Sequence, residues 1–283
     1  MGSYCDLHTH SHYSDGTCAP EQLLQLACDA GLQAIALCDH NTVAGLEDLK
    51  ACAQNSCVEA ICGIEISTDF EGTELHILGL FVTPDQYAPI EELMHRQRLC
   101  KQQSYRDLVA ALNRAGYAID YDTISAATPT GNMNRAVIAA ELTRLGYTES
   151  VQDAFKRLLS PKHGYYVPPK YPDAVEMVAW LKALGLTVVL AHPLLSMDEA
   201  KTRQFLPLAT AAGLDGMEVC YPKYDEAATA LAHSLAEEFG LLPSGGSDFH
   251  GNNKPDIRIG VGRGNLRIPT TWLDALKKKN AGI

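Results

Sequence analysis

The chain has 283 residues, of which 46% are hydrophobic, and its formal net charge is −11. This length suits one barrel-sized domain, alone or with a small insertion. The 34 acidic residues against 23 basic ones disfavour a long nucleic-acid track, which needs a basic stripe. No stretch approaches the roughly 18 uninterrupted apolar residues of a membrane span. A small anionic substrate, held by metal ions and a few arginines, remains compatible with this composition.

The cysteines and the first residues bear on the cellular compartment. The N-terminus has no basic region followed by an apolar core, so no secretion signal is expected. None of the nine cysteines belongs to a C-x-x-C pair. Cys28, Cys38 and Cys62 follow apolar residues, where cysteine behaves as a small hydrophobe. We therefore expect buried free thiols and a cytoplasmic protein.

Short strands and helices alternate through the first third of the chain. An apolar run that ends near His10 predicts the first strand, because a turn at 14–16 follows it. Helical spacing of apolar residues predicts a helix over 20–30 and a second over 42–53, capped by Thr42. The other expected strands are 33–38, 58–67 and 75–82, of which the last two form a hairpin.

An all-helical stretch interrupts this alternation, which returns after residue 170. Helices without an intervening strand are expected at 90–114, 136–145 and 151–159. The later elements are helices at 172–184, 198–212 and 225–239, and strands at 186–191, 216–219 and 241–244. Such alternation is typical of a parallel, barrel-like α/β fold. We interpret the middle stretch as a helical insertion; the alternative is ordinary barrel helices with unrecognised strands between them.

A His-x-His pair stands where the first strand ends. His8 and His10 are alternate residues of a strand, so their imidazoles point the same way and can grip one cation. Imidazole is a common ligand of Zn, Fe and Mn. Two polar residues on an exposed strand face explain the isolated pair equally well, so the rest of the chain decides.

Further potential ligands occur at or near the C-terminal ends of the expected strands. Besides the histidine pair they are Asp15, His40, Glu65, His76, His192, Asp248 and His250. Barrel enzymes build their active sites at this end of the barrel. Unrelated core histidines would not collect there, so the pattern favours a metal site.

The segments that carry these residues resemble the PHP (polymerase and histidinol phosphatase) family. They are Asp6-Leu7-His8-Thr9-His10, Asp39-His40-Asn41, Gly63-Ile64-Glu65, Ala191-His192-Pro193 and Gly246-Ser247-Asp248-Phe249-His250. The resemblance spans nearly the whole chain and is strongest to bacterial members with a helical insertion, the 3′,5′-nucleotide bisphosphate phosphatases and enzymes of the RNase AM type. It implies an α/β fold, a distorted (β/α)7 barrel. We expect the barrel at 1–97 and 165–283, with a helical insertion at 98–164 covering the active site.

The resemblance also implies up to three divalent metal ions per subunit, with Mn²⁺ favoured and Zn²⁺ or Fe²⁺ as alternatives. The implied ligands are His8, His10, Glu65 and Asp248 for the first ion, Glu65, His76 and His192 for the second, and Asp15, His40 and His250 for the third. Many family members have histidine where this chain has Asp15, which makes the third site richer in carboxylate.

Closely spaced divalent cations suit phosphoester hydrolysis, because they clamp a phosphoryl group and activate water. We expect in-line attack of water on phosphorus without a covalent phosphoenzyme. Asp248 is the candidate to accept the water proton, and His192 or His250 is the candidate to support the leaving group.

Substrate choice is expected to come from the insertion. Residues 131–136 predict a turn feeding a helix N-terminus, which is a natural anion site and contains Asn134. Arg135 matches the family's arginine at this turn and can grip a phosphate through two donors. Gln102 and Tyr105 lie one turn apart on the preceding helix; either they face the same pocket or they belong to a plain solvated surface.

The favoured hypothesis is a phosphatase that removes the 3′-phosphate of nucleoside 3′,5′-bisphosphates. The alternatives are a 5′–3′ exonuclease on short RNA or DNA, a histidinol-phosphate-type phosphatase, and a non-catalytic module that stabilises a partner. The complete set of implied ligands disfavours the last. We expect a small nucleotide as the binding partner, with a short oligonucleotide as the alternative, and neither a membrane nor an obligate protein partner.

Overall fold

The computed structural model describes residues 2–128 and 133–282, and the chain divides into two compact units. The first unit combines Met1–Glu92 with Tyr171–Ile283, and the second is Leu93–Lys170. Each unit has its own buried apolar cluster. The division lies within a few residues of the boundaries expected at 97/98 and 164/165. The coverage of the active site by the second unit stays a prediction.

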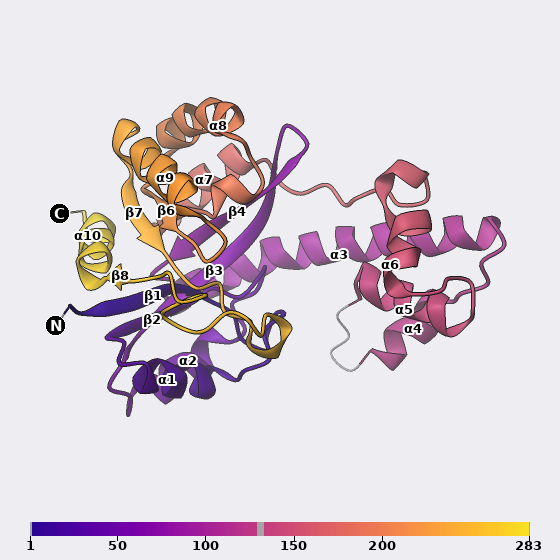
Figure 1. Cartoon of the computed structure of the whole chain (residues 1–283), viewed down its shortest axis with the longest axis horizontal. Helices are drawn as coiled ribbons and strands as arrows, with labels where there is room; N and C mark the ends of the chain where they lie inside the picture. Colours follow the sequence, from indigo (N-terminus) through magenta and orange to yellow (C-terminus); the bar gives the residue numbers. More distant parts are fainter. Residues whose placement is uncertain (1, 129–132, 283) are drawn as a thin grey trace. The chain divides into compact units, whose positions relative to one another are not determined.

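A single mixed sheet forms the barrel of the first unit (Figure 1). Its strands are β1 (Tyr4–Thr9), β2 (Ala34–Leu37), β3 (Glu59–Phe70), β4 (Thr73–Leu80), β5 (Thr187–Ala191), β6 (Gly216–Cys220), β7 (Leu242–Gly245) and β8 (Ile268–Pro269). The sheet order is β7-β6-β5-β4-β3-β2-β1-β8. All neighbours among β1–β7 are parallel except β4, which runs antiparallel to β3 and β5. The distorted seven-stranded barrel is confirmed, with the short β8 as an addition beside β1.

The barrel closes where the segment after β7 runs beside the end of β1. The backbone N–H of Asp248 donates to the carbonyl of His8 at 2.8 Å, and that of His10 donates to the carbonyl of Phe249 at 2.9 Å. Gly246 permits this approach, because a Cβ at its position would lie 2.4 Å from the His8 Cβ. Closure therefore brings the two ends of the predicted ligand set together.

Helices surround the sheet of the first unit, with α1 and α2 on one side and α7 to α9 on the other (Figure 1). They are α1 (Pro20–Asp29), α2 (Leu46–Ala53), α7 (Ala174–Ala183), α8 (Glu199–Ala212), α9 (Glu226–Glu238) and α10 (Thr270–Asn280), with short 3₁₀ turns at Pro193–Leu195 and Gly251–Asn253. Thr42 was wrongly expected to cap the second helix. Gly45 precedes α2 instead, and the Thr42 hydroxyl accepts from the Ala44 backbone N–H within the turn before it.

The described residues of the second unit, 93–128 and 133–170, form helices joined by turns and irregular segments, with no strand among them. The long α3 (Pro84–Arg114) begins in the first unit and continues into the second. It is followed by α4 (Tyr121–Ala127), α5 (Arg135–Arg144), α6 (Val151–Ala154), a π-helical turn at Phe155–Leu159 and a 3₁₀ turn at Pro161–His163. The core of the unit includes the fully buried Leu108, Leu112, Ile138 and Leu142. The helical character expected of the insertion is confirmed.

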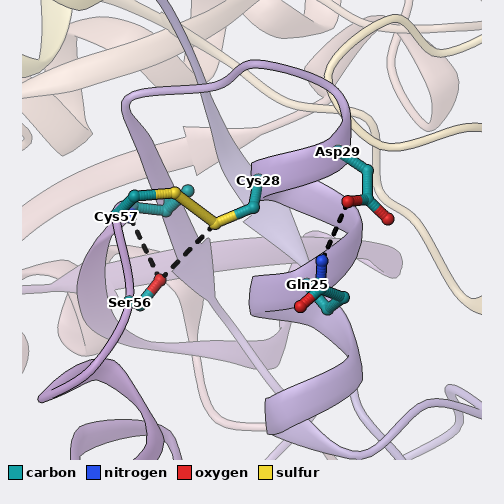
Figure 2. The surroundings of a disulfide bond; sticks show 6 residues. Gln25, Cys28, Asp29, Ser56 and Cys57 are labelled. Atoms are coloured by element: carbon teal, nitrogen blue, oxygen red, sulfur yellow. Dashed lines mark hydrogen bonds between the residues drawn. A yellow bond between two sulfur atoms is a disulfide. The ribbon is translucent and has the colours of Figure 1, made fainter.

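One pair of cysteines departs from the expectation of free thiols. Cys28 at the end of α1 forms a disulfide with Cys57, which lies just before β3 (Figure 2). The fold brings their Cα atoms to 6.5 Å across a separation of 29 residues, so no local spacing revealed the pair. The other seven cysteines are free. Among the described residues no helix is long and apolar enough to cross a membrane.

Replacing Gly246 by alanine should destabilise the barrel, because the new Cβ would lie within 2.4–2.8 Å of three His8 atoms. Overpacking of this kind typically costs about 1–3 kcal/mol. Gly72→Ala is the control, since nothing lies within 4 Å of its Cβ position and only its positive φ opposes the change. Urea unfolding of both variants measures the difference. Equal losses of stability would contradict the close approach at Gly246.

Candidate metal centre

Glu65 of β3 lies fully buried at the centre of the predicted ligand set. Its carboxylate faces five imidazoles, which come from four segments of the first unit, because His8 and His10 share the end of β1. Its Oε2 lies 3.2 Å from His8 Nε2, 3.3 Å from His10 Nε2 and 3.1 Å from His40 Nδ1. Its Oε1 lies 2.9 Å from His76 Nδ1 and 3.0 Å from His192 Nε2.

The three remaining predicted ligands adjoin this group on one side. Asp248 Oδ1 lies 3.2 Å from His10 Nε2, and Asp15 Oδ1 lies 3.1 Å from His250 Nε2. Asp15 Oδ2 is also 4.0 Å from His40 Nε2. The structure thus brings all nine predicted ligand residues into one continuous cluster at the end of the barrel where β1 and β5 finish.

Three residues of this region have left-handed backbone conformations, which residues other than glycine seldom adopt. The φ angles are 54° for Asn41, 28° for His192 and 52° for Asp248. Asn41 and His192 directly follow a bridge or strand, whereas Asp248 directly precedes the bridge residue Phe249. Such conformations cost about 1–3 kcal/mol each, and they concentrate where a site requires a particular side-chain direction.

The metal-free cluster has strongly shifted protonation equilibria. Burial alone would raise the pKa of Glu65, but its electrostatic interaction with the surrounding imidazoles holds it well below its ordinary value. Burial lowers the pKa of His10, yet the neighbouring carboxylates of Asp248 and Glu65 outweigh it and raise that pKa to about 9. Burial also opposes the charge on His76, but Glu65 raises its pKa to about 10. For His40, burial prevails and lowers the pKa to about 3.

Two buried polar atoms of the cluster have no hydrogen-bond partner among the described residues. They are His10 Nδ1 and Glu65 Oε2, on which three imidazole nitrogens converge. The Nε2 atoms of His8 and His10 also face each other at 3.0 Å. Buried polar atoms are normally satisfied, and a divalent cation would satisfy these lone pairs. A mixed donor set of nitrogen and carboxylate oxygen fits Mn, Fe or Zn.

Three side chains outside the predicted ligand set support it. Glu218 Oε1 lies 3.0 Å from His8 Nδ1, and Glu218 Oε2 accepts from the His192 backbone N–H at 2.8 Å. Tyr221 Oη and Lys254 Nζ each donate to Asp248 Oδ2 at 2.7 Å. Of these three side chains, only Glu218 could have been singled out from the sequence, because it lies in an expected strand of the barrel. Lys254 belongs to an irregular loop and offered none.

The predicted substrate-binding residues lie in the second unit and have differing environments. Asn134 caps α5 by accepting from the Val137 backbone N–H, and the half-buried Arg135 stacks its guanidinium 4.6 Å over the Tyr166 ring. Tyr105 is only 5% exposed and packs in the core of the unit, whereas Gln102 is exposed. The structure therefore does not bring Gln102 and Tyr105 to one surface. Gly131 and Asn132 of the predicted turn lie outside the described residues.

Removing the central carboxylate should release more metal than removing a peripheral one. Glu65→Gln deletes the charge that five histidines face, so we expect about two metal equivalents to be lost. Asp15→Asn affects the group that Asp15 forms with His10, His40 and His250 and should cost about one equivalent or less. Elemental analysis of the folded, dialysed proteins measures both. Equal losses would contradict a central position for Glu65.

Metal binding should strengthen as pH rises, because protons compete for the ligand nitrogens. In the metal-free protein, His10 and His76 have pKa values of about 9 and 10, so each carries a proton at neutral pH that metal must displace. His40, with its pKa near 3, has none to lose. Calorimetry in two buffers of different ionisation enthalpy should show proton release near neutral pH that fades as pH approaches 10. Binding without proton release would contradict these shifts.

Several known proteins are similar to this chain over most of its length. The PHP domain family matches residues 6–167. A 5′–3′ exoribonuclease of Haemophilus influenzae is 33% identical over 247 residues, covering 87% of this chain and 89% of that protein. A phosphoribosyl 1,2-cyclic phosphate 1,2-diphosphodiesterase of Eggerthella lenta is 31% identical over 253 residues, covering 87% and 94%. A 3′,5′-nucleoside bisphosphate phosphatase of Chromobacterium violaceum is 28% identical over 249 residues, covering 87% and 86%.

Solved structures are similar over almost the whole chain. A Bifidobacterium adolescentis protein assigned as a metal-dependent phosphoesterase superposes with a TM-score of 0.77 at 26% identity, covering 98% of this chain and 96% of the other. A Chromobacterium violaceum amidohydrolase, solved with bound sulfate and no metal, gives a TM-score of 0.77 at 25% identity over 98% and 97%. The chain belongs to the PHP domain family and is a metal-dependent phosphoesterase.

Proposed function

We propose that this phosphoesterase removes the 3′-phosphate of nucleoside 3′,5′-bisphosphates and releases the 5′-monophosphate and phosphate. The observation that carries the proposal is the presence of two separate features suited to anions. One is the nine-residue cluster around Glu65, and the other is Arg135 at the start of α5. The Chromobacterium violaceum relative named for this activity supports the choice of substrate.

The cluster is proposed to hold up to three divalent cations, with Mn²⁺ as the working ion. His8, His10, Glu65 and Asp248 would hold the first, Glu65, His76 and His192 the second, and Asp15, His40 and His250 the third. When bound, such ions clamp phosphoryl oxygens, lower the pKa of water and stabilise the leaving oxygen. Nitrogen and carboxylate donors without thiolate suit Mn²⁺, and Zn²⁺ or Fe²⁺ fit the same set.

Asp248 is proposed to accept the proton of the attacking water. Its Oδ1 faces His10, while Tyr221 and Lys254 hold its Oδ2, so the carboxylate has a fixed direction. His250 Nδ1 lies 2.8 Å from the Asp248 carbonyl oxygen, which can only accept, so this nitrogen carries the proton. His192 or His250 is proposed to support the leaving oxygen.

Arg135 is proposed to bind the 5′-phosphate. Its guanidinium packs on Tyr166 and donates to the Leu159 carbonyl at 3.4 Å, so part of its donor fork is already oriented. None of the ion pairs among the described residues involves Arg135, which leaves its charge available to an anion. The first backbone N–H groups of α5 favour an anion at the same place. The proposal requires the second unit to present Arg135 to the metal cluster.

A 5′–3′ exonuclease acting on short oligonucleotides is the second candidate. The Haemophilus influenzae relative of that name is more similar to this chain, at 33% identity, than the bisphosphate phosphatase, at 28%. The same metal chemistry hydrolyses a diester. The net charge of −11 favours a substrate of a few nucleotides over a long polymer.

Arg135→Ala should lower kcat/KM for adenosine 3′,5′-bisphosphate by about 100-fold or more, because the phosphate that orients the reacting one loses its anchor. Adenosine 3′-monophosphate lacks that phosphate, so its slower hydrolysis should change by less than about 3-fold. Arg144→Ala is the matched control, since Arg144 lies on the same helix and pairs at the surface with Glu141. Phosphate release and product chromatography measure both reactions.

Two outcomes would count against the substrate proposal. Equal losses for the two substrates would show that Arg135 does not hold the second phosphate. Faster wild-type turnover of a 5′-phosphorylated short RNA than of the bisphosphate would favour the exonuclease, and turnover of histidinol phosphate alone would favour that phosphatase.

A further inference from the structure

Glu218 is a fully buried carboxylate that the metal sites proposed above do not use. It lies in β6, between β5 and β7, with Ser244 as its neighbour in register. A buried carboxylate is costly unless polar groups satisfy both oxygens. Those of Glu218 are satisfied by two predicted metal ligands, His8 from β1 and His192 after β5.

The contact with His8 decides which ring nitrogen carries the proton. Glu218 Oε1 lies 3.0 Å from His8 Nδ1, and a carboxylate oxygen accepts a hydrogen bond from the ring N–H. The proton therefore stays on Nδ1, and the lone pair is left on Nε2. That nitrogen lies 3.2 Å from Glu65 Oε2 and 3.0 Å from His10 Nε2, at the centre of the cluster. A carboxylate behind a metal-binding imidazole fixes its tautomer and raises its basicity in this way.

The contact with His192 fixes its backbone. Glu218 Oε2 accepts from the His192 N–H at 2.8 Å, at a residue whose φ is 28° and ψ is 52°. This conformation is unfavourable for histidine and persists only where surrounding contacts hold it. It places His192 Nε2 3.0 Å from Glu65 Oε1. Glu218 thus contacts two predicted ligands, of which His8 faces Glu65 Oε2 and His192 faces Glu65 Oε1.

We propose that Glu218 is a positioning residue that sets the tautomer of His8 and the backbone of His192 together, so that the first and second metal sites form as one unit. This inference rests on the metal sites proposed above. Glu218, His8 and His192 also place three donor atoms close enough to hold a cation themselves. Such a cation would take the lone pair of His8 Nδ1 and leave the proton on Nε2, which removes His8 from the Glu65 cluster.

The decisive measurement is the tautomer of His8 in the zinc-loaded wild-type protein. Zn²⁺ is used as the probe because it has a closed d shell and permits NMR. Long-range ¹H–¹⁵N spectra of histidine-labelled protein, with His8→Asn for assignment, should show a proton on Nδ1 and metal on Nε2. A His8 Nδ1 without a proton overturns the proposal and assigns Glu218 as a ligand.

A pair of variants tests the coupling of the two sites. Glu218→Gln keeps the size of the side chain but replaces one acceptor by a donor, so zinc affinity should fall about 10–100-fold for two ions together. Ser244→Ala is the matched control, because it removes a buried hydroxyl on the adjacent strand that has no partner among the described residues. It should keep the wild-type zinc affinity. Calorimetric titration gives the affinities.

The outcomes separate this inference from the metal sites on which it rests. A wild-type protein that takes up no zinc overturns both. If Glu218→Gln binds zinc as tightly as the wild-type protein, the role proposed for Glu218 is overturned, while the proposed metal sites stand. Loss of a single ion in Glu218→Gln also contradicts the proposal, because the two sites would then be independent. If the variant does not fold, the wild-type tautomer decides the matter.

Discussion

The carboxylate of Glu65 is the group on which the arrangement of the barrel end depends. An isolated buried charge costs several kcal/mol, which only paired charges or a cation can offset. Five imidazoles surround this one, and they come from segments as far apart in sequence as His8 and His192. Because these imidazoles come from four separate segments, the barrel must close before the cluster is complete. Folding and assembly of the cluster are therefore one process.

The antiparallel direction of β4 also serves the surroundings of Glu65. Parallel strands present their C-terminal ends to the site, so an antiparallel strand presents its N-terminal half there. His76 lies in the first half of β4 and is paired with Ser67 of β3 and Ala191 of β5, next to His192. The hairpin thus supplies an imidazole from an extended strand, while the others come from strand ends. The antiparallel strand β4 thus places His76 next to Glu65 Oε1.

Local sequence patterns were enough to predict most strands and helices and to single out the candidate ligands. A strand that ends in a histidine and a turn can be recognised from a few neighbouring residues. Features that depend on distant parts of the chain were not predicted. The Cys28–Cys57 disulfide joins segments with no common motif, and Lys254 reaches Asp248 from a loop without a pattern. Gln102 and Tyr105 show a different limit. Their spacing allowed a shared face, but an aromatic ring gains more from burial in the core of the second unit.

The metal cluster alone does not determine which phosphoester reacts. Relatives named as an exoribonuclease, a cyclic phosphate diphosphodiesterase and a bisphosphate phosphatase each align over 87% of this chain. A cluster of divalent cations stabilises the charge that develops in the hydrolysis of either a monoester or a diester. Selection must then come from binding energy at groups that do not react, where a second phosphate or a nucleobase can be held. In this chain the helical unit carries the half-buried Arg135. Under the proposal that Arg135 holds the phosphate that does not react, the groups for chemistry and those for substrate choice belong to different units, so one kind of metal cluster can serve several reactions.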